Sequence, residues 1–168
     1  MSETSLQIKT LSQMGSADPW RLGLAHVAPY NMLFWFTRGQ GRTLLEGRGL
    51  GPHNAVYIPA GTLFSLDLGA QSLGQAVIIP VGTQLRLPDM PRHLRVRDVL
   101  VQSELSGIIE AAHREQSQSR PLAHDALEAH VALISVWLRG QIALEKHVPN
   151  PRTAGERLSK RFTQMIPK

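Results

Sequence analysis

The amino-acid sequence changes its periodicity once, near Pro80, and this change limits the folds that the chain can adopt. Before Pro80, short apolar segments alternate with turns that contain glycine or proline, a pattern typical of an antiparallel sandwich or barrel. After residue 98, apolar residues recur every three or four positions, as they do in helices with one buried face. We therefore expect strands followed by helices, in a chain of 168 residues that is long enough to bury a core.

The expected strands lie mainly between residues 31 and 79, and a turn bounds each of them. Segment 31–37 is rich in aromatic residues, which favour a packed, pleated surface, and it leads into a predicted hairpin turn at 38–42. Further strands are expected at 43–46, 55–58, 63–68 and 75–79, with a corner at Pro59-Ala-Gly61. The first 18 residues show no clear period, and we expect an arm or a first strand there.

Two long helices are expected after the strands. Residues 88–91 contain two prolines and form a predicted linker, and Asp98 is a suitable N-cap for a helix that continues to about Gln116. A break at Ser117–Pro121 separates this helix from a second one at about 122–146. The sequence thus predicts a pair of helices that follow the β domain.

The second helix carries an apolar stripe at steps of three and four residues. The stripe consists of Leu127, Val131, Ile134 and Leu138. One small barrel cannot cover two helices on all sides. We therefore expect this stripe to be exposed and to form a homodimer with a second copy of the chain.

The positive charge of the chain is concentrated at its C-terminal end. The net charge is +5, and residues 152–168 contribute +4 of it. Thr153 and Glu156 form a predicted capping box for a short third helix. This segment is either a solvated tail or a weak, salt-dependent attachment to nucleic acid.

The composition excludes several classes of protein. The chain contains no cysteine, so it has neither disulfides nor thiolate metal sites. It has no apolar run of about 18 residues and no secretory signal at its start, so we expect a cytoplasmic protein without a membrane partner.

The spacing of the turns resembles that of the cupin barrel, whose motifs are G-x5-H-x-H-x3/4-E-x6-G and G-x5-P-x-G-x2-H-x3-N. Gly39 and the Pro59-Ala-Gly61 corner match the turn positions of these motifs. The family's metal-ligand positions hold His26, Ala28, Met32 and Phe64. A divalent metal needs three or four donors, so we expect no metal, no cofactor and no catalytic residue. The alternative is a small metal-dependent cupin enzyme, a dioxygenase or an isomerase.

The apolar replacements predict a binding site for a small organic molecule. The resemblance to a cupin implies that the ligand positions point into the barrel. Alternation along the strands from these positions then places Met32, Phe34 and Phe36 on the inward face, with Phe64 and Leu66 opposite them. Together with His26, these side chains could line a cavity for an organic effector. The alternative is that they fill the barrel as its core.

The order of the segments resembles the N-terminal sensor half of AraC/XylS-type transcriptional regulators. The resemblance rests on residues 33–42, 57–61 and 78–88, and on 153–166, which look like the first helix of the family's DNA-binding domain. It implies a cupin-like barrel (a double-stranded β-helix or jelly roll) at 1–90 that binds an effector. It also implies a two-helix dimerisation unit at 91–148, and a linker with the start of a helix-turn-helix domain at 149–168.

The part of the chain after the capping box of the predicted third helix is short. Only 15 residues follow Thr153, too few for a helix-turn-helix unit. We therefore expect a truncated gene or a fragment of a longer regulator, and DNA binding only in a longer protein that contains the helix-turn-helix domain.

Overall fold

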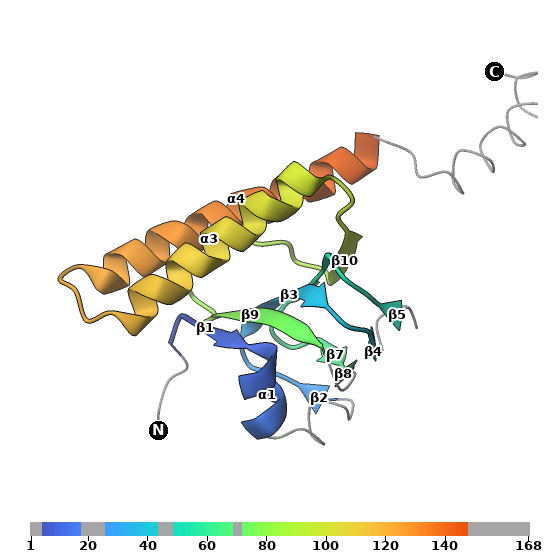
Figure 1. Cartoon of the computed structure of the whole chain (residues 1–168), viewed down its shortest axis with the longest axis horizontal. Coiled ribbons are helices and arrows are strands. Elements are labelled where there is room, and N and C mark those ends of the chain that lie inside the picture. The colour runs from blue at the N-terminus through green and yellow to red at the C-terminus, as the bar shows by residue number, and fades with distance from the viewer. Residues whose placement is uncertain (1–4, 18–25, 44–48, 69–71, 148–168) are drawn as a thin grey trace, which may run out of the picture.

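A computed structural model describes residues 5–17, 26–43, 49–68 and 72–147 (Figure 1). In this structure, two long helices lie across one side of a five-stranded antiparallel sheet. The prediction of strands followed by two long helices is confirmed. The predicted third helix and its capping box lie outside the described residues, and closure of the sheets into a barrel stays a prediction.

The main sheet has five antiparallel strands. In spatial order they are β1 (Gln7–Thr10), β9 (Leu73–Ile79), β3 (Asn31–Arg38), β6 (Asn54–Ile58) and β10 (Arg92–Arg95). Two smaller antiparallel sheets accompany it, one of β2 (His26–Val27) with β7 (Leu63–Phe64), the other of β5 (Gly49–Leu50), β4 (Gly41–Thr43) and β8 (Leu66–Leu68). A turn follows β3, where Gly39 has a φ of 94° that few other residues adopt. The predicted hairpin is wrong, however, because the next strand, β4, pairs with β5 and β8 and not with β3.

Two elements differ from the sequence-based expectation. A short helix, α1 (Leu11–Ala17), directly follows β1. It begins with a reciprocal capping box, because the Thr10 hydroxyl accepts from the Gln13 N–H and the Gln13 side-chain oxygen accepts from the Thr10 N–H. Directly after the predicted linker, the structure has the strand β10, which pairs with β6.

The two long helices agree closely with the expected ones. Helix α3 (Val99–Ser117) begins after Asp98, whose carboxylate accepts from the N–H groups of Leu100 and Val101. Helix α4 (Ala123–His147) runs back alongside it (Figure 1). In the described part of the chain, neither these helices nor α1 is long and apolar enough to cross a membrane.

At its far end, α3 is joined to the edge of the main sheet. The side-chain amide of Gln116 donates to the Ile8 carbonyl at 2.8 Å, and its oxygen accepts from the Ile8 N–H at 2.6 Å. Ile8 lies on β1, the edge strand, so the helix pair is attached to the sheet through backbone groups as well as through apolar packing.

The apolar side chains form two clusters, one on each side of the main sheet. The first cluster lies under the helices and includes Leu33 and Trp35 of β3. The second cluster lies on the opposite side and includes Met32, Phe34 and Phe36 of the same strand. Because successive side chains of a strand point to opposite faces, β3 contributes to both clusters.

Candidate functional site

The second cluster contains five of the six predicted ligand-binding residues. Met32, Phe34, Phe36, Phe64 and Leu66 all belong to it, and none is more than 3% exposed. The rings of Phe34 and Phe64 face each other with centroids 6.3 Å apart and planes inclined by 47°. The structure therefore brings these side chains into one enclosed, aromatic group, and their role in binding an effector stays a prediction.

The sixth predicted residue, His26, lies beside this group in the backbone. His26 is the direct partner of Phe64 in the β2–β7 pair, and Ala28 is buried in the second cluster. The side chain of His26 is outside what the structure describes. Among the described residues, no three His, Asp or Glu side chains are grouped as metal ligands. The described side chains of this group are apolar and almost fully buried.

On the side of the main sheet that faces the helices, Trp35 of β3 contacts both α3 and α4. The indole N–H of Trp35 donates to the Ser106 hydroxyl of α3 at 3.0 Å. Its ring meets that of Trp137 on α4 edge to face, with centroids 6.0 Å apart. Trp35 is adjacent in sequence to Phe34 of the second cluster, so one strand links the predicted ligand residues to the helix pair.

The same side of the sheet also holds a buried hydroxyl group. Tyr57 belongs to the first cluster, and its hydroxyl has no hydrogen-bond partner among the described residues. Burial raises the pKa of Tyr57 to about 12, because the ionised form would lose its hydration. This residue has no sequence signal beyond its place in an apolar strand.

The expectation that the apolar stripe of α4 is exposed is wrong. Leu127, Val131, Ile134 and Leu138 belong to the first cluster and are at most 5% exposed in the single chain. They face α3 and the main sheet, because the sheet presents a wide apolar face that the helix pair covers. These four side chains are therefore core residues and are not available to a second copy.

A second stripe lies on the opposite side of α4. We call it the outer stripe, and its members are Ala126, Ala129, Leu133, Val136, Gly140 and Ala143. Leu133 and Val136 are 52% and 56% exposed, unlike the buried stripe. The steps between members alternate between three and four residues, which is the repeat of a coiled-coil contact. Small residues make up most of this stripe, so its apolar signal in the sequence is weak.

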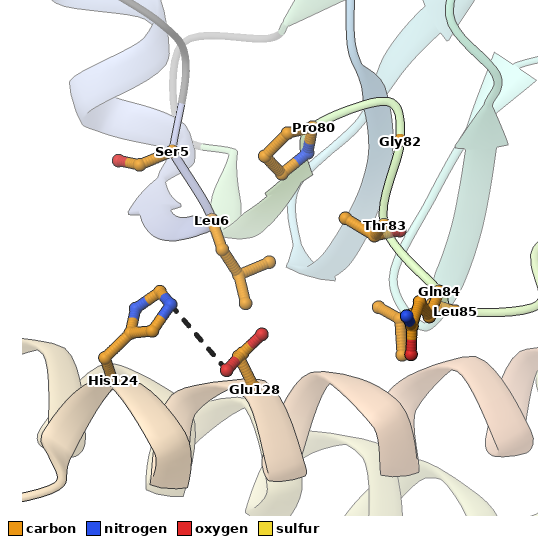
Figure 2. Close-up of a pocket in the computed structure, with 9 residues that line it drawn as sticks. All are labelled: Ser5, Leu6, Pro80, Gly82, Thr83, Gln84, Leu85, His124 and Glu128. Atoms are coloured by element: carbon orange, nitrogen blue, oxygen red, sulfur yellow. Dashed lines mark ion pairs between the residues drawn. The ribbon is translucent and has the colours of Figure 1, made fainter.

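A groove lies between α4 and the end of the main sheet (Figure 2). It encloses about 480 Å³ and is lined by Ser5, Leu6, Pro80, Gly82, Thr83, Gln84, Leu85, His124 and Glu128. On the helix side, His124 Nε2 lies 3.7 Å from Glu128 Oε1, with both side chains mostly exposed. We call this site the α4 groove. Three segments far apart in the sequence form it, so no local motif could have indicated it.

A hydrogen-bonded turn lies at the other end of the sheet, between β5 and β6. The Asn54 side chain is buried; its oxygen accepts from the Gly51 N–H at 3.2 Å, and its amide donates to the Pro52 carbonyl at 3.2 Å. His93 Nε2 of β10 lies 2.7 Å from the same Asn54 oxygen, so this nitrogen is the donor. The backbone of His53 adopts a φ of 63° within this turn.

Comparison with known proteins gives a limited result. No protein-family model matches the sequence, and no curated protein matches it. The chain is similar to a crystal structure of apo ToxT from Vibrio cholerae, in a variant with one lysine replaced by alanine, with a TM-score of 0.43 and 10% identity. The match covers 86% of this chain and 54% of the ToxT chain, so this chain spans about half the length of that protein. A likeness of this degree does not assign a family.

Proposed function

We propose that this chain is the small-molecule-sensing and dimerisation part of an AraC-type transcriptional regulator. The sequence segments that resemble this family support the proposal. The observation that carries it is the double role of β3, whose alternate side chains line the second cluster and contact both helices. A ligand that contacts Phe34 on one side of this strand would therefore act next to Trp35, which contacts the helix pair on the other side.

The mechanism is a shift between two arrangements of the helices. An apolar organic effector in the second cluster contacts Phe34 and Phe64 and changes their packing. Trp35 moves with its neighbour, and its contacts with Ser106 and Trp137 transmit the change to α3 and α4. The effector acts only through the difference in its affinity for the two arrangements.

A ligand screen with matched variants tests the sensing role. Organic molecules that raise the melting temperature are titrated by calorimetry into the wild type and into Phe64→Leu, with Leu63→Ala as the control. Leu63 is the other residue of β7 and is mostly exposed. We expect weaker binding in Phe64→Leu alone. Unchanged binding in Phe64→Leu, together with loss in Leu85→Ala, would place the effector in the α4 groove instead.

The dimer forms through the outer stripe of α4 in this proposal. Its alanines and Gly140 allow two helices to approach closely, and Leu133 and Val136 supply the apolar contact. A double variant, Leu133→Glu with Val136→Glu, should be a folded monomer by size exclusion with light scattering. Leu73→Glu, an exposed position on β9, is the control and should stay dimeric. A wild-type monomer at tens of micromolar would refute this part of the proposal.

Two further measurements separate the rival functions. The cupin-enzyme alternative requires a bound metal, so stoichiometric iron, zinc, manganese or nickel in the purified protein would favour it over sensing. DNA binding is proposed only for a longer protein with a helix-turn-helix domain. Tight binding of this chain to DNA in 200 mM salt would contradict that restriction, because about four net charges support only weak attachment.

A further inference from the structure

We propose that a hollow between the β5–β6 turn and β10 binds a small organic carboxylate through Arg95. We call it the β10 hollow; it is an open depression of about 310 Å³, and the described residues that line it are Gly49, Leu50, Gly51, Asn54 and Arg95. This volume is at the lower end of the range for small-molecule sites, so it suits a compact metabolite. The site is separate from the α4 groove and shares no lining residue with it.

The charge of the hollow selects an anion. Arg95 is exposed and lies directly opposite Asn54 across the β6–β10 pair. Its neighbours Leu94 and Val96 are buried in the first cluster, so Arg95 points to the other side of the strand, as His93 does. In the described part of the chain, no carboxylate forms an ion pair with Arg95, and none lines the hollow. A free guanidinium matches a carboxylate with two parallel hydrogen bonds.

The walls of the hollow are rigid and leave the backbone accessible. Asn54 fixes the turn through Gly51 and Pro52, and it holds β10 through His93. A Cβ added at Gly51 would meet nothing within 4 Å, so this position is open. A ligand therefore finds a preformed site, which lowers the entropy cost of binding.

The floor of the hollow is apolar. Leu50 lines it and is also a buried member of the second cluster. A ligand with a carboxylate at one end and an aromatic or short aliphatic body at the other satisfies both Arg95 and Leu50. We therefore assign the ligand class as a small carboxylate with an apolar body.

Calorimetric titration with benzoate, benzamide and inorganic phosphate tests this assignment. Benzoate should bind saturably, while neutral benzamide, which has the same shape, should not. Arg95→Gln should weaken benzoate binding about 10- to 100-fold, the usual contribution of hydrogen bonds to a charged group. Arg95→Lys should restore part of the affinity, because it keeps the charge but not the paired geometry. Arg97→Gln is the matched control, since it removes the same charge from an exposed position outside the hollow.

Several results would overturn the inference. These are the absence of saturable benzoate binding at millimolar concentration, equal binding of benzamide, preference for phosphate over benzoate, or an equal loss in Arg97→Gln. Each variant is first checked for an unchanged melting temperature. The inference does not depend on the proposed sensing role, because effector binding in the second cluster is tested by Phe64→Leu and not by Arg95.

Discussion

Replacement of Phe64 by alanine tests how the second cluster is packed. Phe64 is fully buried, and its ring lies against that of Phe34. The substitution removes the ring and leaves a space that its neighbours fill only in part. Phenylalanine-to-alanine changes in protein cores cost about 3–5 kcal/mol of unfolding free energy, the sum of lost apolar burial and the cavity that remains. We expect a loss in this range.

The loss is measurable by urea unfolding followed by circular dichroism, and by the melting temperature. In a chain of this size, a loss of that magnitude lowers the melting temperature by roughly 6–20 °C. Leu63→Ala is the control, because Leu63 is on the same two-residue strand and is 55% exposed. Its side chain is half in water already, so we expect a loss below about 1 kcal/mol.

The result that would refute this reasoning is specific. A loss below about 1 kcal/mol in Phe64→Ala, or an equal loss in both variants, would mean that Phe64 does not pack against the cluster. A second measurement supports the comparison. An apolar cavity the size of a ring binds small aromatic molecules. Toluene should therefore raise the melting temperature of Phe64→Ala and leave that of Leu63→Ala unchanged.

Three further predictions concern stability. Gly74→Ala should destabilise the protein by several kcal/mol in urea unfolding, because the added Cβ would lie 2.0 Å from the Trp35 carbonyl oxygen. Gly107→Ala, in open space on α3, should stabilise the protein by about 0.5–1 kcal/mol. The reverse order of the two stabilities would contradict the β3–β9 register. Asp98→Ala should cost about 1 kcal/mol, since it removes the N-cap of α3, and Asp98→Asn should retain most of the stability. The pKa of Tyr57 is about 12 in the folded chain and near its ordinary value of 10 in the unfolded chain. The free energy of unfolding should therefore fall as the pH rises from 10 to 12. Tyr57→Phe should reduce that fall.

The elements that the sequence predicted correctly are those with strong local signals. Asp98 precedes a long periodic segment, and α3 begins directly after it. Gly39 stands in a turn that needs a positive φ, and the turn is there, although the strand after it pairs in another sheet and forms no hairpin with β3. Helix α1 was missed because it spans only two turns, although Thr10 and Gln13 form a capping box that the sequence already contains. Strand β10 was missed because prolines precede it and it pairs with a distant segment.

The candidate sites divide in the same way. Strand alternation correctly grouped Met32, Phe34 and Phe36 on one face of β3, because a period of two needs no tertiary information, whereas placing Phe64 opposite them required the resemblance to the cupin motif. Helical spacing could not show which of the two apolar stripes on α4 faces the sheet, since Leu138 and Leu133 are both leucines at that spacing. Burial decides between them, and burial depends on the packing of the whole chain. The α4 groove and the β10 hollow are formed by segments that only the fold brings together.

The pair of hydrogen bonds between Gln116 and Ile8 has a consequence for how copies of this chain meet. The two bonded groups of Ile8 are the ones that an added strand would use, and a side-chain amide from α3 occupies both. At the opposite edge, β10 presents arginines, which discourage strand addition. Growth of the sheet from one molecule to the next, the usual beginning of fibrous aggregation, is therefore hindered at each of its edges.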